Sequence, residues 1–391
     1  MSIRIGIMTY YHAVNYGAFL QSYALSERLN QEEDFQAEIV NYRMQIEADN
    51  YMEFIKPRKN LFRMRCYIIR NKTFEASLKL LKLSKEECVS DHVEDFINLV
   101  KDKYDVLIAG SDEIWKFTCY RGFPTPYYLP GDLGSRKLAY AVSGRIPFSN
   151  LPKEKLNLLH KYLQEFEYIG TRDITTYHEV VNLLRSRNKV YYNYDPTFIY
   201  DFKPDREHGR AILKERYHIN LNKKCIGVMF SEKARSNDNL IRYLKKCFGS
   251  EIELVSLYDW EFGVTNTPDL TPLEWVDVVA ALDIVISHYF HAICFSIITG
   301  TPFFAIEVIT KDIRESKIYD LLVRFDLLSY YTKSLPNVIE TGKLRHFVES
   351  VEPGSKRYYK EKILEAKTDF ENFVKVVRCK ENEESKYIIN Q

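Results

Sequence analysis

The sequence predicts an α/β protein made of two Rossmann-like, doubly wound domains that face a cleft, and two observations support this fold class. Short apolar segments alternate with longer segments in which apolar residues return every three to four positions. The alternation occurs on both sides of a polar segment at 201–209, and 391 residues are enough for two domains. Such alternation is typical of parallel sheets covered by helices.

The first half of the chain opens with a strand, a helix and a second strand. Five strands are predicted in this half, at 3–8, 38–42, 105–110, 137–142 and 167–170, with helices at 16–25 and 153–166. Residues 44–100 are rich in Lys, Arg, Glu and Leu and contain almost no glycine, which is typical of helices. We therefore expect an N-terminal domain at 1–205 with a helical insertion at 44–100.

The second half repeats the pattern after the predicted linker at 201–209. Its expected elements are strands at 225–230, 252–258, 284–287 and 303–306, and helices at 239–248, 272–282 and 290–299. Thr271, Pro272 and Glu274 form a helix start signal, with a cap, a proline at the first position and a capping-box glutamate. The predicted domain spans 206–350, and a helical tail at 351–391 contains a charged helix at 360–380.

Composition excludes several classes of protein. The 55 Lys and Arg residues balance 54 Asp and Glu residues, so no global field attracts nucleic acid. The seven cysteines are odd in number and widely spread, which indicates thiols used in packing rather than a disulfide framework. The short apolar run at 3–8 is not expected to act as a signal peptide, and no apolar stretch approaches the length that spans a bilayer. We expect a cytoplasmic protein, with peripheral contact at the inner face of the membrane left open.

Chemistry is expected where the predicted strands end, because ligands of open parallel sheets bind beyond the carboxyl ends. After the first strand come Asn15, Tyr16 and Gly17, whose backbone amides at a helix start could hold an anion or a sugar hydroxyl. The alternative is a turn that only needs a glycine.

A second segment, at 110–115, follows the third predicted strand. It offers Ser111, Asp112 and Glu113, although a helix cap explains part of it. Trp115 in the same segment favours a core position over a platform for sugar stacking.

Two further segments follow later strands. Arg172 could present a bidentate fork to a carboxylate or phosphate, or form a salt bridge with Asp173 or another acid. His288 and His291 open a predicted helix, where an imidazole could lie beside an anion held by backbone amides. A hydrogen-bonded structural histidine is the alternative there. No third ligand is visible at useful spacing, so no metal is expected.

Taken in order, these segments resemble the polysaccharide pyruvyl transferase family. The resemblance rests on five segments and covers about residues 3–310; the segments are Asn15-Tyr16-Gly17-Ala18, Gly110-Ser111-Asp112-Glu113-Ile114-Trp115, Thr171-Arg172-Asp173, Asp195-Pro196-Thr197 and the histidine segment that ends at Gly300-Thr301-Pro302-Phe303. It implies a fold like GT-B glycosyltransferases, phosphoenolpyruvate as donor substrate, no cofactor, and a pyruvate ketal on a sugar of a polysaccharide or its lipid-linked precursor.

The resemblance also implies residue roles. His291 matches the family's acid/base histidine, and Arg172, His288, Tyr289 and Ala292 are assigned to the donor. Asn15, Tyr16, Gly17, Ser111, Asp112 and Glu113 are assigned to the acceptor or the cleft. Several relatives carry an arginine two residues before the histidine and other members carry a serine, where this chain has Tyr289.

Two other functions remain compatible with the sequence, because one fold hosts many activities. A nucleotide-sugar glycosyltransferase of the same architecture would bind a nucleoside diphosphate sugar and not phosphoenolpyruvate. A non-catalytic carbohydrate-binding relative would bind sugar without releasing phosphate.

Overall fold

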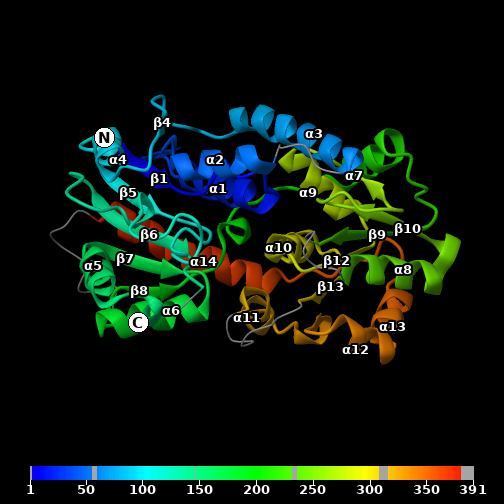
Figure 1. The fold of residues 1–391 in the computed structure, drawn as a ribbon. Coiled ribbons are helices and arrows are strands. Elements are labelled where there is room, and N and C mark those ends of the chain that lie inside the picture. Colours follow the sequence, from blue (N-terminus) through cyan, green and yellow to red (C-terminus); the bar gives the residue numbers. More distant parts are fainter. Residues whose placement is uncertain (1, 55–59, 146, 231–235, 308–315, 380–391) are drawn as a thin grey trace. The chain divides into compact units, whose positions relative to one another are not determined.

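The computed structural model describes residues 2–54, 60–145, 147–230, 236–307 and 316–379. The chain divides into two compact units (Figure 1). Unit 1 consists of the described residues within 2–54, 78–201 and 363–379, and unit 2 of those within 60–77 and 202–362. Each unit contains a six-stranded parallel sheet with helices, which confirms the prediction of two Rossmann-like α/β domains.

The sheet of unit 1 is entirely parallel and has the strand order β2-β1-β5-β6-β7-β8. Its strands are β1 (Ile3–Met8), β2 (Phe35–Ile39), β5 (Val106–Ala109), β6 (Arg136–Val142), β7 (Phe166–Thr171) and β8 (Val190–Tyr192). The chain moves from β1 to one side and then continues with β5 on the other side. Ligands of open sheets bind beyond the carboxyl ends at such a reversal, so the segments after β1 and β5 lie at the expected binding edge.

Helices cover both faces of this sheet. On one face, α1 (Tyr16–Leu29) and α14 (Lys360–Arg378) lie together, with Arg28 over the ring of Phe370, which in turn contacts Tyr140 of β6. The apolar core of the other face includes residues of α4 (Val93–Val100), α5 (Lys153–Gln164) and α6 (Ile174–Leu184). Also in unit 1 are α2 (Gln45–Phe54) and a small parallel sheet of β3 (Tyr42–Arg43) and β4 (Cys88–Val89).

The sheet of unit 2 is also parallel, with the order β11-β10-β9-β12-β13-β14. Its strands are β9 (Lys224–Met229), β10 (Ile252–Ser256), β11 (Thr265–Asn266), β12 (Ile284–Ser287), β13 (Phe303–Ile306) and β14 (Tyr331–Thr332). Here the chain reverses between β9 and β12, which is the dinucleotide-fold order. The segment that follows Ser287 therefore lies at the point where a ligand is expected.

The helices of unit 2 form two groups. One group contributes to the apolar core beside the sheet and consists of α8 (Ser236–Phe248), α12 (Leu335–Glu340) and α13 (Lys343–Ser350). In the second group, α9 (Pro272–Ala281) packs on α10 (Phe290–Thr299) through Trp275 and Phe295, and α7 (Arg206–Ala211) packs on α9. The predicted capping box of Thr271 and Glu274 is confirmed. Unit 2 also contains α3 (Leu61–Ser77) and α11 (Lys317–Arg324).

The division of the chain differs from the predicted domains in two places. Residues 60–77 of the predicted insertion belong to unit 2, where Tyr67 of α3 donates a hydrogen bond to Asp259 (3.4 Å). Residues 363–379 of the predicted tail belong to unit 1, because the apolar side of α14, including Phe370 and Phe373, is buried there. Residues 55–59 and 380–391 of these predicted segments lie outside the described residues.

Smaller predictions need correction as well. The predicted linker at 201–209 contains the first turn of α7, which Asp205 caps by accepting a hydrogen bond from the His208 amide (2.9 Å). The second strand ends at Ile39, and Tyr42 begins the short strand β3 instead. The edge strands β8, β11 and β14 were not predicted, since two or three residues give no measurable periodicity.

Two findings concern the whole described chain. No disulfide joins any of the seven cysteines, and Cys225 and Cys294 are buried. None of the helices in the described ranges is both long enough and apolar enough to cross a membrane.

Candidate active site

The turn after β5 in unit 1 is held in one conformation by contacts with two other elements. Gly110 has φ +152°, and a Cβ at this position would lie 2.0 Å from the backbone oxygen of Tyr140. The next residue, Ser111, is fully buried, and its amide donates to the Gln21 side chain on α1 (3.2 Å). Thr9, just after β1, donates to the Ser111 backbone oxygen (3.3 Å). These contacts connect the carboxyl ends of β1 and β5.

Asp112 follows in a backbone conformation that is uncommon for residues other than glycine, with φ +79°. Its Oδ1 accepts hydrogen bonds from the Glu113 amide (2.9 Å) and from Arg172 Nη2 (3.0 Å). Left-handed backbone at a non-glycine residue is enriched at functional sites, because the surrounding structure must hold it in place. The backbone geometry therefore indicates that Asp112 is a candidate functional residue.

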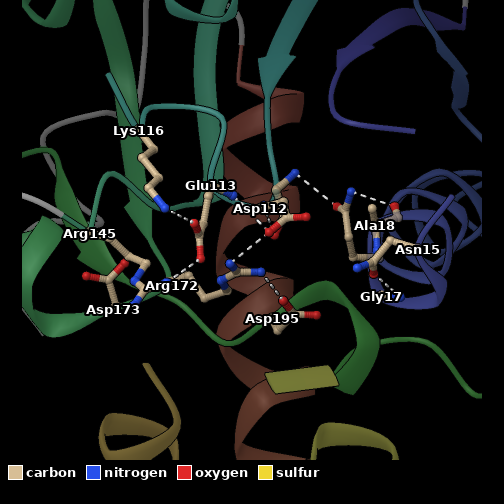
Figure 2. Close-up of polar contacts among 12 residues, drawn as sticks. Asn15, Gly17, Ala18, Asp112, Glu113, Lys116, Arg145, Arg172, Asp173 and Asp195 are labelled. Carbon is tan, nitrogen blue, oxygen red and sulfur yellow. Dashed lines mark hydrogen bonds and ion pairs between the residues drawn. The ribbon is translucent and has the colours of Figure 1, made fainter. Parts of the chain in front are cut away.

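Arg172 lies between two carboxylates at the end of β7 (Figure 2). Its Nη1 donates to Asp195 Oδ2 (2.8 Å), and its side chain is 2% exposed. Burial opposes the charge, but Asp112 and Asp195 together raise the pKa of Arg172 above its ordinary value. Of the two roles that the sequence left open, the structure shows the salt bridge, although with Asp112 and Asp195 and not with Asp173.

Asp173 has a local role instead. It caps α6, accepting hydrogen bonds from the backbone amide and the hydroxyl of Thr176 (2.8 and 2.9 Å). An anionic ligand would thus meet Arg172 already engaged by two other carboxylates.

Glu113 is a partly buried carboxylate between two cations. Arg145 Nη1 donates to Oε1 and Lys116 Nζ donates to Oε2, both at 3.2 Å (Figure 2). A carboxylate has lone pairs beyond these two contacts, so it can also accept a hydrogen bond from a hydroxyl. Trp115, two residues on, is fully buried with its indole N–H donating to the Tyr127 carbonyl (3.0 Å), which confirms the predicted core position.

Asn15 is the N-cap of α1. Its Oδ1 accepts hydrogen bonds from the amides of Gly17 (2.8 Å) and Ala18 (3.2 Å). Tyr16 is fully buried. The amides that the sequence offered to a ligand are therefore satisfied within the chain, and the structure gives Asn15 the ordinary task of a cap.

A buried cluster around Glu47, also in unit 1, was not predicted. His12 Nε2 lies 3.3 Å from Glu47 Oε2, Arg121 Nη1 lies 3.1 Å from Oε1, and Tyr127 donates its hydroxyl hydrogen to Oε2 (3.0 Å). Burial works against the charge of Glu47, yet these contacts hold the pKa of its carboxyl below the ordinary value. His12 follows β1, but Glu47 and Arg121 are distant in sequence and carry no motif.

In unit 2 the segment after β12 turns sharply into α10. The Ser287 hydroxyl donates to the Met229 carbonyl at the end of β9 (2.8 Å) and accepts from the Tyr289 amide (2.9 Å). Tyr289 is the N-cap of α10 but makes no side-chain hydrogen bond to the first turn, which contains no acidic residue. Amides at such a helix start, including that of Ala292, are suited to binding an anion.

Aromatic rings surround the two histidines of this segment. His288 packs edge-on against Phe230 (5.2 Å between ring centroids) and is tilted against Tyr289 (4.8 Å). Burial lowers the pKa of His288 to about 4, so its imidazole is neutral at neutral pH. His291, 8% exposed, lies edge-on to Phe290 (5.1 Å) in the first turn of α10.

The predicted residues thus fall into two sets. Asn15, Ser111, Asp112, Glu113 and Arg172 lie at the carboxyl edge of the sheet in unit 1, and positions 288–292 lie at that edge in unit 2. Asp195 also belongs to the first set, and it is part of a segment that carries the family resemblance. Its pairing with Arg172 could not be inferred from the sequence, because 23 residues separate the two.

Two other features do not point to a site. A surface cavity of about 810 Å³ lies at the amino ends of the strands of unit 1, where Arg136 and Glu167 already pair (2.7 Å). Among the described residues, no group of three or more His, Cys, Asp or Glu side chains is arranged to hold a metal ion.

Comparison with known proteins gives a family and a fold. The family model described as "Polysaccharide pyruvyl transferase" matches residues 15–308. The comparison with curated proteins gave no match.

Several solved structures are similar over nearly the whole chain. The Anabaena protein HepE in complex with UDP-glucose has a TM-score of 0.56 at 9% identity, with 96% of this chain and 100% of that chain covered. The UDP-GlcNAc 2-epimerase of Methanocaldococcus jannaschii has a TM-score of 0.56 at 10% identity, with coverage of 96% and 99%. The Neisseria meningitidis UDP-GlcNAc 2-epimerase bound to UDP-GlcNAc has a TM-score of 0.52 at 10% identity, with coverage of 96% and 100%. At these identities the similarity shows a GT-B-like fold and nothing finer.

Proposed function

Because this chain belongs to the polysaccharide pyruvyl transferase family, we propose that it transfers the enolpyruvyl-derived group of phosphoenolpyruvate to a sugar. The acceptor is a sugar residue of a polysaccharide or of its lipid-linked precursor, and the product is a pyruvate ketal. One observation carries the proposal: His291 lies in the first turn of α10, directly after the strand where the sheet of unit 2 reverses.

The reaction requires one proton transfer to carbon and one to phosphate. Protonation of the methylene carbon of phosphoenolpyruvate turns it into a methyl group and leaves positive charge on the carbon that bears the phosphate. One sugar hydroxyl adds to that carbon, inorganic phosphate departs with cleavage of the carbon–oxygen bond, and a second hydroxyl closes the ketal. The two hydroxyl protons balance the new methyl hydrogen and the proton taken up by phosphate.

We assign the proton transfers to His291, because an imidazole can both give and take a proton. His288 is a poor candidate for this task, since burial lowers its pKa to about 4. The amides at the start of α10, which the side chain of the N-cap residue Tyr289 does not cap, would stabilise the negative charge of the donor.

Asp112 and Glu113 of unit 1 are the proposed ligands of acceptor hydroxyls. Both carboxylates are held by cations, Asp112 by Arg172 and Glu113 by Arg145 and Lys116, which fixes their positions. Fixed acceptors for hydrogen bonds are suited to orienting a sugar. The two carboxylates engaged by Arg172 favour a role for that residue in positioning Asp112, in addition to the donor contact that the family resemblance implies.

A nucleotide-sugar glycosyltransferase is the second candidate. The structures of HepE and the Neisseria meningitidis epimerase contain UDP-glucose and UDP-GlcNAc on the same fold. A thermal-shift screen separates the two candidates, since only one of them predicts stabilisation by phosphoenolpyruvate.

The direct test is phosphate release from phosphoenolpyruvate with a panel of galactosides, glucosides, mannosides and lipid-linked N-acetylhexosamines. We expect turnover with at least one acceptor, and His291→Ala should reduce it by roughly 10²- to 10⁴-fold. His346→Ala, which changes an exposed histidine on α13 of the same unit, is the matched control and should leave turnover unchanged. Full activity in His291→Ala would refute the acid/base role, and sugar binding without phosphate release would favour a non-catalytic carbohydrate-binding protein.

A further inference from the structure

Arg70 of α3 is a buried cation that none of the roles assigned above uses. Its side chain is 2% exposed in unit 2, although α3 is inserted in the sequence between β3 and β4 of unit 1. Its ion pair with Asp259 has a distance of 3.8 Å between Nη1 and Oδ1, which is too long for a hydrogen bond. The Nε of Arg70 has no hydrogen-bond partner among the described residues.

A series of ring contacts leads from this guanidinium to the start of α10. The guanidinium carbon of Arg70 lies 4.3 Å from the ring centroid of Tyr258, which follows β10. Tyr258 meets Tyr289 edge to face at 5.6 Å, and Tyr289 contacts His288 at 4.8 Å. Arg70 therefore belongs to the same aromatic cluster as the N-cap of α10.

One donor of this cation, Nε, is buried without an acceptor among the described residues. A buried guanidinium with an unpaired N–H is costly, because the group loses its water and regains only part of the lost interactions. Burial raises the pKa of Tyr289 above its ordinary value, so its phenol stays neutral and supplies no charge at the helix start. An anion bound there would gain a cation only from another element, and α3 places one in the same cluster.

We propose that Arg70 binds an anionic group of the donor substrate beside the start of α10. The planar guanidinium can offer Nε and one Nη to two oxygens of a phosphate or carboxylate. In this arrangement the inserted helix α3 is a donor-binding element of unit 2, and it supplies the charge that Tyr289 does not. The proposal rests on the proposed function, because it takes phosphoenolpyruvate as the anion.

The first test compares substitutions on α3 in the full-length protein. Arg70→Gln should raise the KM for phosphoenolpyruvate roughly 10- to 100-fold, as expected for the loss of charge-assisted hydrogen bonds, and leave the KM for the sugar acceptor unchanged. Arg70→Lys keeps the charge without the planar fork and should give a smaller increase. Arg65→Gln, at an exposed arginine on the same helix, is the matched control and should behave like the parent protein.

The second test separates binding from a structural role. Tyr289→Arg in the Arg70→Gln background should recover most of the affinity for phosphoenolpyruvate, since it restores a guanidinium to the cluster. A structural role predicts that Arg70→Gln lowers the thermal midpoint and worsens both KM values together, with no recovery in the double variant. That outcome overturns the proposal. So does an unchanged KM in a folded Arg70→Lys or Arg70→Gln protein.

A third measurement does not depend on turnover. Calorimetric titration with inorganic phosphate should show binding to the parent protein and much weaker binding to Arg70→Gln. Phosphate binding that depends on Arg70, in a protein that never turns over phosphoenolpyruvate, would refute the proposed function but keep the anion site. Equal turnover in the parent protein and in Arg70→Gln would refute the anion site at Arg70 but keep the proposed function.

Discussion

The carboxyl edges of the two sheets differ in how their charged side chains are paired. In unit 1, the cations lie against carboxylates: Arg172 contacts Asp112 and Asp195, and Arg145 contacts Glu113. In unit 2, aromatic rings lie around His288 and Arg70 at the corresponding edge, and the ion pair of Arg70 with Asp259 is long (3.8 Å). Two sheets with similar topology therefore present one edge whose charges are internally balanced and one edge suited to an incoming anion.

The physical consequence is a division of tasks. Balanced ion pairs at 2.8–3.2 Å hold side chains in place, and this suits the orientation of a neutral, hydroxyl-rich ligand. An apolar surrounding strengthens electrostatic contacts and shifts pKa values, and this suits the binding of a charged donor and the movement of protons.

Arg172→Met should produce the largest loss of stability, because it leaves Asp112 and Asp195 without their shared cation. Removal of one partner from a buried charge network typically costs about 3–5 kcal/mol. Urea denaturation of the variant, monitored by a probe in unit 1, measures the change. The triple variant Arg172→Met, Asp112→Asn, Asp195→Asn should recover part of the loss. A decrease below about 1 kcal/mol would mean that the charges of unit 1 are not balanced as the distances indicate.

His288 should make unit 2 sensitive to acid. Its pKa is lowered to about 4 by burial, whereas an unfolded histidine titrates near 6.5. The unfolded chain therefore binds more protons between these values, so the stabilising contribution of neutral His288 is complete above about pH 6.5 and is lost as the pH falls toward 4. The expected loss is about 3 kcal/mol between pH 7 and pH 4.

His288→Phe keeps an apolar ring and removes the titration. Denaturation midpoints measured across this pH range should therefore fall less steeply in the variant than in the parent protein. Equal slopes would show that the imidazole is accessible to water. His346→Phe, at an exposed position, serves as the control and should not change the slope.

Substitution of Asn15 has the smallest expected effect on stability. It tests whether the Asn15 side chain binds substrate or only caps α1. Asn15→Ala should cost about 1 kcal/mol in unfolding free energy, the usual value for a lost N-cap. Asn15→Asp keeps a capping oxygen and should retain both stability and phosphate release. A stable but inactive Asn15→Asp protein would instead assign the side chain to substrate binding, in line with the acceptor or cleft role given to Asn15 with the family resemblance.

Much of the fold could be predicted because its signals are local. The long strands and the helices at 16–25, 272–282 and 290–299 follow from apolar periodicity, and the cap of α9 follows from Thr271 and Glu274. The edge strands β8, β11 and β14 are too short for such a signal. The inserted helix α3 and the terminal helix α14 are located by the apolar surface against which each one packs. That surface exists only in the folded chain.

The candidate site shows the same division. The sequence by itself determined which residues follow the ends of the strands: Asp112, Arg172 and the segment at 288–292. Only the tertiary structure decided their partners, because an ion pair forms over a few ångströms between residues that are far apart in sequence. In the folded chain, Arg172 pairs with Asp112 and Asp195. Arg70, which comes from an insertion in the sequence, lies in the cluster that contains Tyr289. Short motifs show which charged groups the chain has, and the fold determines which of these groups are already paired within the chain.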